Sequence, residues 1–416
     1  MIKSAPFKQK KEKLFTRNFS LLVIGQIISI LGNMVLTFAL PLYVLEISGS
    51  PRLFGLLLGL SNIPLLLFSP IGGIIADRLK KQKIMFWLDL ITTIIIIVYI
   101  ALSGFLTNII PIIFVKLMAL NSIQGMYMPV VQAAVPLLVK EDKLVSANSV
   151  TGIVNSFSMM AGMAIAGFML DRFGITSILI ISAICFAITA IMDLLIKIPY
   201  KKQKQTDSVA KMVKSDLTEA TRFTLKDKPI IAKISLVLFF FILTFMAMIM
   251  VGMPILITQY LNMDMGYVGI SQGIMMTGGI IGAIAAGALK MKVKKLWVVL
   301  MLSSLFGLPF GLIMLVEIHY FTAFIILTAT SVISLAFATI GQILVMSYLQ
   351  KIIPCELIGK VMAIVLMLPF LGQALGNSFY GTLFEAFNPY QVVFVGVILT
   401  IFVAVYTKVI SKKIVE

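Results

Sequence analysis

Residues 73–83 read Gly-Ile-Ile-Ala-Asp-Arg-Leu-Lys-Lys-Gln-Lys and stand between two apolar stretches, 53–76 and 84–104. Each stretch is about 20 residues long, which is enough to cross a bilayer as a helix. An Asp-Arg pair at the edge of such a stretch, followed at once by a basic run, is typical of a short loop at a membrane surface. The segment therefore predicts a tight, charged turn between two membrane-spanning helices.

The remaining positive charges follow the same pattern along the whole chain. Hydropathy divides the sequence into about twelve apolar stretches, and 31 of the 34 Lys and Arg residues lie in the two tails and the connectors after even-numbered stretches. Arg52 and Arg172 fall in the other connectors, and Lys116 lies inside a span. Because cytoplasmic loops retain Lys and Arg during insertion, we predict a multi-pass protein of the cell membrane with both termini in the cytoplasm. The predicted spans are 19–46, 53–76, 84–104, 109–136, 144–170, 175–198, 230–260, 266–289, 295–316, 320–350, 357–384 and 390–410.

Composition leads independently to the same class of protein. The chain is 60% hydrophobic and 12% charged, with a mean hydropathy of +1.07, which is too apolar for a soluble protein of 416 residues. A net charge of +17 would suggest nucleic acid in a soluble chain, but here the basic residues border helix ends. The expected partner of these charges is therefore the headgroup region of a lipid bilayer, and no nucleic acid is expected.

The titratable residues argue against an enzyme or an ATP-driven pump. One histidine and two cysteines supply neither a metal cluster nor a disulfide framework, so no metal or cofactor is expected. No glycine-rich loop with Lys and Ser or Thr is present to hold ATP phosphates.

The predicted fold class is an all-α membrane protein with twelve transmembrane helices in two six-helix bundles. We expect a basic tail (1–18), a first bundle (19–198), a cytoplasmic linker (199–229), a second bundle (230–410) and a tail (411–416). Within the linker, Ser208 to Leu225 fits either an amphipathic helix on the membrane surface or a solvated connection.

The two halves of the chain repeat an ordered set of residues. Pro41, Gly55, Gly59 and Gly73 in the first half correspond to Pro254, Gly269, Gly273 and Gly287 in the second. Gln132 and Pro136 likewise correspond to Gln350 and Pro354. Such a repeat predicts two parallel bundles related by a pseudo-two-fold axis, as in transporters that build their path between two halves. The glycine pairs 55/59, 269/273, 278/282 and 372/376 predict close helix contacts.

Several motifs resemble those of the major facilitator superfamily. Gly73, Asp77, Arg78 and Lys81 match its signature loop between the second and third helices, although Lys80 replaces the second glycine. Residues 31–43 with Ser48-Gly49-Ser50, and residues 129–136 with Ala147-Asn148, resemble the macrolide-efflux branch. Gly162 to Gly167 is similar to the exporter motif of the fifth helix, with Met163 in place of its proline and Ala166 in place of one glycine.

This resemblance implies the major facilitator fold and a secondary transporter, normally a monomer, that works by alternating access. Its branch implies export of bulky, largely apolar small molecules of the macrolide or multidrug type in exchange for protons. Export of an endogenous product such as a siderophore, lipid or peptide is the alternative. Uptake, or a non-transporting receptor or scramblase on the same fold, also remains open.

The resemblance also implies a gate on the cytoplasmic side. Asp77 is expected to cap the helix that starts near residues 356–359, because a carboxylate is favourable at a helix N-terminus. Asp77→Asn should then shift the protein toward an inward-open state, which the accessibility of an engineered cysteine would reveal.

Helices 1, 4, 7 and 10 line the central cavity in this superfamily. The cavity candidates on these helices are Asn33, Thr37, Lys116, Asn121, Gln124, Tyr127, Met246, Met250 and Gln342, and neighbouring helices add Asn155 and Asn377. Methionine suits promiscuous apolar surfaces because its side chain is flexible and polarizable. Asn121, four residues before Gly125, stands where many proton-coupled exporters carry an arginine.

Acidic residues are scarce in the middle of the predicted spans, which argues against a pump for polycations. The proton-coupling candidates are Asp89, Asp193 and Glu46. Lys116 is the one cation within a span, and it fits either a functional role or snorkelling to the nearby outer surface.

Overall fold

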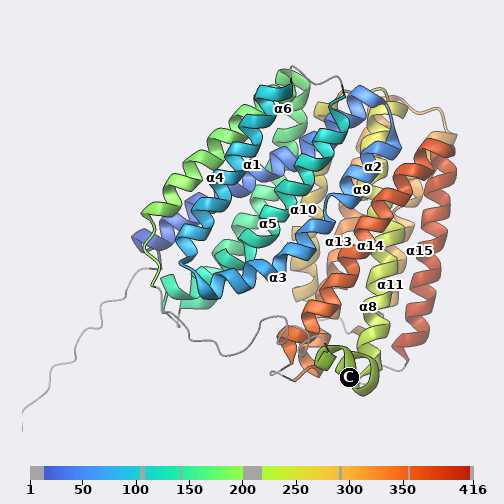
Figure 1. The fold of residues 1–416 in the computed structure, drawn as a ribbon. Helices are drawn as coiled ribbons and strands as arrows, with labels where there is room; N and C mark the ends of the chain where they lie inside the picture. Colours follow the sequence, from blue (N-terminus) through green and yellow to red (C-terminus); the bar gives the residue numbers. More distant parts are fainter. Residues whose placement is uncertain are drawn as a thin grey trace, which may run out of the picture.

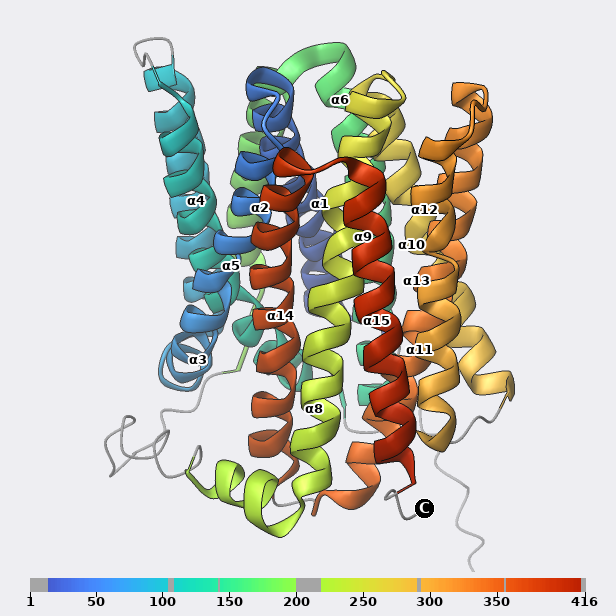
Figure 2. The same ribbon diagram turned by 90° about the vertical axis from the view of Figure 1, so that its right-hand side faces the viewer.

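The computed structural model of the protein describes residues 14–103, 108–140, 143–199, 218–289, 293–354 and 357–412. Regular structure in these ranges is helical throughout (Figures 1 and 2). Eleven of the described segments are long and apolar enough to cross a membrane. Eight of these segments carry a single helix label: α1 (Arg17–Ser48), α4 (Lys81–Ser103), α5 (Ile110–Leu138), α6 (Leu144–Leu195), α10 (Met265–Leu289), α13 (Tyr320–Ile352), α14 (Ile358–Ala386) and α15 (Pro389–Ser411).

The longest of these, α6, consists of two spans joined by a tight turn. Gly174 has φ = 70° and ψ = 175°, a backbone conformation that helices do not contain and that side chains with a Cβ rarely adopt. The chain reverses direction there, so the predicted spans 144–170 and 175–198 are both present. With α6 divided at Gly174, the described helical segments account for all twelve predicted spans.

Three further spans are interrupted. The second span consists of α2 (Pro51–Leu60) and α3 (Ile63–Arg78), and the ninth of α11 (Leu296–Leu305) and α12 (Leu308–Leu312). The seventh consists, in chain order, of α8 (Pro229–Phe241), the π-helical segment η3 (Ile242–Met246), α9 (Ala247–Ile255) and the π-helical segment η4 (Leu256–Tyr260). The sequence analysis did not predict these interruptions.

Proline explains the break in the second span. Pro64 lacks a backbone N–H and its ring would clash with the carbonyl of Leu60, four residues earlier. The helix therefore ends at Leu60, and local side chains take up the freed carbonyls. Ser61 Oγ donates to the carbonyl of Leu57, and Asn62 Nδ2 donates to that of Leu58 (2.7 Å).

The helices before and after the linker form two halves that meet at one end of the molecule. We call the end with residues 139–140, 196–199 and 218–229 the linker end, and the end with residues 49–50, 174 and 261–264 the far end. Close to the far end, α2 lies beside α14 and α6 lies beside α10. Toward the linker end, α3 turns away from α14 (Figures 1 and 2).

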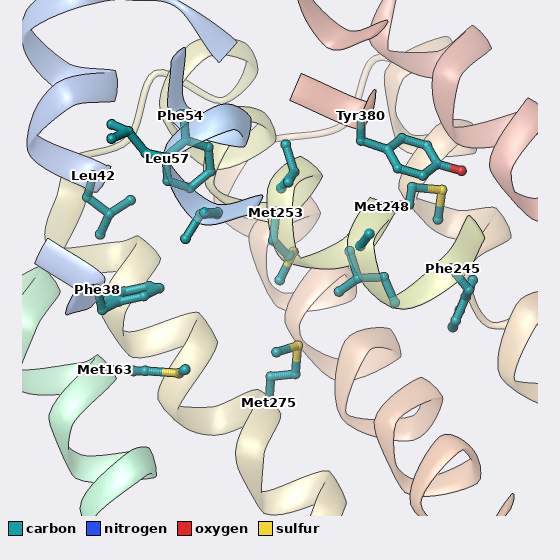
Figure 3. Packing of buried hydrophobic residues seen from close by; sticks show 14 of the residues in the cluster. Phe38, Leu42, Phe54, Leu57, Met163, Phe245, Met248, Met253, Met275 and Tyr380 are labelled. Carbon is teal, nitrogen blue, oxygen red and sulfur yellow. The ribbon is translucent and has the colours of Figure 1, made fainter. Parts of the chain in front are cut away.

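A large apolar core joins the two halves. Phe38 and Leu42 of α1 and Phe54 and Leu57 of α2 belong to one buried cluster with side chains of the second half (Figure 3). From the second half, Met248, Met253, Met275, Phe245 and Tyr380 belong to it. These three methionines are buried, so they fill space between helices in this conformation.

The predicted small-residue contacts are confirmed. Gly55 and Gly59 face α14, Gly269 and Gly273 face α6, Gly278 and Gly282 face α13, and Gly372 and Gly376 face the seventh span. At each of these glycines, an added Cβ would lie closer than 3.0 Å to an atom of the neighbouring helix. The glycines therefore set how closely these helices approach.

Several predictions fall outside the described residues. They concern residues 1–13, 200–217, 355–356 and 413–416, together with the side chains of Asp77 and Arg78. The proposed cap of Asp77 on the eleventh span therefore stays a prediction. Within the linker, residues 218–227 are helical.

Candidate functional site

Two carboxyl groups lie together inside the first half of the molecule. Asp89 comes from α4 and Asp193 from the end of α6, and each side chain is only 2% exposed. The two carboxyls are close enough to interact electrostatically. Asp89 is eight residues from the start of α4, which places it about 12 Å along that helix. The pair is thus a buried acidic site that the sequence analysis listed only as separate residues.

Polar side chains from the surrounding helices complete this site. Tyr127 of α5 is buried beside both carboxyls and close to Ser29 of α1, which is also buried. Thr189 lies one turn before Asp193 on α6, is buried beside Asp89, and donates through its Oγ1 to the carbonyl of Phe186 (3.0 Å). The site is therefore enclosed by four helices of the first half, α1, α4, α5 and α6.

The hydrogen-bonding capacity of the acidic site is incompletely used. Among the described residues, Oδ2 of Asp89 and Oδ2 of Asp193 have no hydrogen-bond partner, and neither carboxyl forms an ion pair. Gln26 Oε1, one turn before Ser29 on α1, is also buried without a partner. Burying ionised carboxylates in this way costs several kcal/mol each.

A second group of candidates gathers at the break between α2 and α3. Asn121 Nδ2 of α5 donates to the carbonyl of Ser61 (2.8 Å). Asn377 Nδ2 of α14 donates to the carbonyl of Leu58 (3.3 Å), and Asn377 Oδ1 accepts from Gln373 Nε2 (2.6 Å). Both asparagines are buried. The amide side chains from each half therefore bind carbonyls at the same break.

Lys116 lies apart from both groups. It is 4% exposed, and its Nζ is 3.6 Å from the centroid of the Tyr99 ring, a cation–π arrangement. The Nζ atom has no hydrogen-bond partner in the described part of the chain. Lys116 is therefore held by an aromatic ring of α4 and does not reach the exposed surface.

Glu46, the third proton candidate, does not join Asp89 and Asp193. It lies at the far end, where it interacts electrostatically with Asp171. Both residues line an open pocket of about 390 Å³ between the two halves. Glu46 therefore belongs to a separate, exposed acidic region.

The other cavity candidates differ in exposure. Thr37 is half-buried, and its Oγ1 donates to the carbonyl of Asn33 (2.7 Å). Asn33 itself is buried. Gln342 is exposed, and the half-buried candidates are Gln124, Asn155, Met246 and Met250. Of the predicted motif residues, Lys81 Nζ donates to the carbonyl of Ala76 (2.9 Å), and Gly73 has open space around it. In the exporter motif, Gly162 lies against Met34 and Gly167 against Gly269.

Sequence reasoning missed Gln26, Ser29 and Thr189. Helical spacing was the available signal, because Gln26, Ser29 and Asn33 share one face of α1, and Thr189 is four residues before Asp193. No metal site accompanies these residues: the described part of the chain has no cluster of three or more His, Cys, Asp or Glu residues suited to a metal ion.

The sequence of the chain matches a known family over most of its length. Residues 22–377 match the Major Facilitator Superfamily. The chain belongs to this superfamily. It is therefore a multi-pass membrane protein and a secondary transporter of small molecules, and not an enzyme.

Relatives of known name are distant. Macrolide efflux protein A of Streptococcus pyogenes is 24% identical to this transporter over 175 residues, which span 42% of this chain and 43% of that protein. The uncharacterized MFS-type transporter YfiS of Bacillus subtilis is 27% identical over 174 residues, 41% of this chain and 40% of that protein. The chain thus matches less than half of the length of either relative.

Solved structures share the fold of this transporter across nearly its whole length. The nucleoside transporter NupG superposes with a TM-score of 0.76 at 14% identity, covering 95% of this chain and 100% of that one. A bacterial homologue of the iron transporter ferroportin, in an inward-facing state, gives 0.71 at 14% identity, covering 95% and 98%. At this level of identity, the likeness concerns the fold alone.

Proposed function

We propose that this transporter exports bulky, largely apolar small molecules of the macrolide or multidrug type in exchange for protons. The observation that carries the proposal is the buried pair Asp89 and Asp193, with a free oxygen on each carboxyl. The distant similarity to macrolide efflux protein A supports the substrate class. The transporter is proposed to act as a monomer in the cell membrane, with both termini in the cytoplasm.

Protons fit the acidic site better than the transported molecule does. All the helices around Asp89 and Asp193 belong to the first half, and the site is buried among them. A bulky substrate needs the wider space between the two halves, whereas a proton needs only a carboxyl oxygen. Taking up a proton removes the cost of a buried charge, and releasing it restores that cost.

One helix connects the acidic site to the contact between the halves. Tyr127 beside the carboxyls and Asn121 at the break in the second span lie on α5, six residues apart. The same break also binds Asn377 of the second half. A shift of α5 on proton uptake would therefore reach the carbonyls that tie the two halves together.

The conformation fits one stage of the transport cycle. The halves are in contact at the far end, which we propose faces the outside, and α3 and α14 diverge toward the linker end. In this state, substrate would enter from the cytoplasm as protons leave the acidic site. The opposite state would release the substrate outward and load protons from outside.

The test is accumulation of radiolabelled erythromycin in cells that express the transporter, with and without a protonophore. We expect lower accumulation than in cells with the empty vector, and the protonophore should reverse the difference. Asp89→Asn should behave like the empty vector, and Glu317→Gln, which changes an exposed far-end carboxyl, should behave like the wild type. Accumulation equal to that of the empty vector would contradict macrolide export.

Export of an endogenous product is the second candidate, because the named relative matches over only 43% of its length. In that case, cells lacking the transporter would retain a metabolite that wild-type cells release. A comparison of the metabolites in the medium of the two strains would identify it. A receptor or scramblase on this fold would show no dependence on the protonophore in either experiment.

A further inference from the structure

Two helix pairs bring the halves together at the far end, and an acidic residue marks each contact. In the first pair, Glu385 stands next to the last residue of α14. Its Oε2 accepts hydrogen bonds from Ser50 Oγ and from the backbone N–H of Arg52 (3.0 Å). Ser50 is the N-cap of α2, so a carboxylate of the second half binds the first turn of a helix of the first half.

One stripe of α14 holds the short helix α2 at both ends. Asn377, Gly381 and Glu385 follow each other at four-residue intervals, so they lie on one face of α14. A Cβ on Gly55 would be 2.6 Å from the Cα of Gly381, which shows how closely the backbones approach. While Glu385 binds the N-terminal turn of α2, Asn377 donates to the carbonyl of Leu58 near its C-terminal end.

The internal repeat reproduces this contact at the second helix pair. The same interval of 214 residues separates Gly55 from Gly269, Gly167 from Gly381, and Asp171 from Glu385. Gly167 and Gly269 touch each other as Gly381 and Gly55 do. A Cβ on Gly266, in the first turn of α10, would lie 3.4 Å from Asp171 Oδ2. Asp171 Oδ2, which also lies 3.6 Å from Arg172 Nε of its own half, is therefore beside the start of α10, at the position that corresponds to Glu385 beside the start of α2.

A carboxylate at the first turn of a helix is stabilising, because unpaired N–H groups and the positive end of the helix dipole point toward it. Contacts inside one half stay the same when the halves move, but these two cross the boundary that alternating access has to open. In an opened far end, both carboxylates would exchange their helix partners for water. Their stabilising effect therefore belongs to the closed state alone.

We propose that Glu385 and Asp171 are a symmetry-related pair of latches that hold the far side of the transporter closed. Each acts as a positioning residue: Glu385 caps α2 of the opposite half with hydrogen bonds, and Asp171 places its negative charge beside the first turn of α10. The proposal does not depend on the identity of the substrate, so it stands apart from the proposed macrolide export.

The test measures the distance across the far end by double electron–electron resonance on the purified full-length transporter in lipid nanodiscs. Spin labels are attached at Ile47→Cys and Val316→Cys, two exposed far-end positions in opposite halves. Both native cysteines are first replaced by Cys185→Ala and Cys355→Ser. The variants are Glu385→Gln, Asp171→Asn and their combination, with Glu317→Gln as a control acid outside both helix contacts.

We expect the wild type to be dominated by one short-distance population. Each latch variant should raise the ratio of long to short distances by roughly two- to fivefold, the effect of removing a negative charge from a helix N-terminus. The combined variant should multiply the two effects, because the two contacts are separate. Glu317→Gln should match the wild type.

The proposal would be overturned if both single variants gave the distance distribution of the wild type while remaining monodisperse. It would also be overturned if Glu317→Gln shifted the distribution equally. The two latches are tested independently, so a failure of one variant to fold leaves the other to decide. Because no transported molecule is added, a negative result here would leave the proposed export function untouched.

Discussion

The side chains of Asp89 and Asp193 are the groups that we propose to bind and release the exchanged protons. We predict that an infrared difference spectrum between acid and alkaline conditions contains a carboxyl band from a dry environment. Asp89→Asn and Asp193→Asn should each remove most of it, because the two groups share one site. Glu317→Gln should leave it unchanged. A band that persists in both Asn variants would exclude the pair as a proton carrier.

The role of a second buried residue, Lys116, can also be tested by substitution. Its buried Nζ lies over Tyr99, and replacing a buried charge with an apolar side chain of similar length is often neutral or stabilising. We therefore predict that Lys116→Met leaves the melting temperature of the detergent-solubilised protein unchanged or higher. Lys116→Ala should lower it, because the shorter side chain leaves a cavity. Loss of transport in a stable Lys116→Met protein would instead assign Lys116 a functional role.

Among the helices, the break between α2 and α3 can be tested through the hydrogen bond that Asn121 donates to it. Asn121→Ala would leave the buried carbonyl of Ser61 without its donor, which costs about 1–3 kcal/mol. We predict a lower melting temperature for this variant, and little change for Gln124→Ala, whose half-buried side chain is on the same helix. Equal effects of the two substitutions would show that the bond to Ser61 is not important.

The contact between α10 and α13 can be tested with two adjacent glycines. A Cβ on Gly278 would meet the backbone of Val332, with the carbonyl carbon 3.0 Å away. On Gly279, it would approach only Thr339 Oγ1, at 3.8 Å. Gly278→Ala should therefore reduce the yield of monodisperse protein and its melting temperature, whereas Gly279→Ala should be tolerated. The reverse order would contradict the helix packing described here.

The sequence predicted the helices better than it predicted their interruptions. Apolar length and the position of Lys and Arg were enough for twelve spans, and glycine spacing was enough for the close helix contacts. The break at Ser61–Asn62 was missed because Pro64 is only one of several prolines in spans; Pro41, Pro129 and Pro254 lie inside continuous helical stretches. Whether a proline breaks a helix depends on which neighbours bind the freed carbonyls.

The candidate site shows the same limit. Asp89 and Asp193 were predicted as separate proton carriers, but they are 104 positions apart in the chain, and their meeting depends on how α4 and α6 are rotated about their axes. The polar partners Ser29 and Thr189 were missed because hydroxyl groups are common in membrane helices. The contacts of Glu385 and Asp171 with opposite helices needed the arrangement of the two halves.

The whole molecule is organised as two repeats that meet at the far end. The buried cluster, the glycine contacts Gly55–Gly381 and Gly167–Gly269, and the hydrogen bonds of Glu385 all join the halves. The proposed proton site is enclosed within the first half, with α5 between it and the contact. We propose that α5 transmits a change of charge at this site to the contact between the halves.

The most direct test of proton-driven export is uptake of radiolabelled erythromycin into inside-out membrane vesicles with an imposed pH gradient, acidic inside. We expect severalfold accumulation by the wild type and by Glu317→Gln, and a protonophore should abolish it. We expect no gradient-driven accumulation by Asp89→Asn or Asp193→Asn. Accumulation by these two variants equal to that of the wild type would contradict proton-driven export through the acidic site.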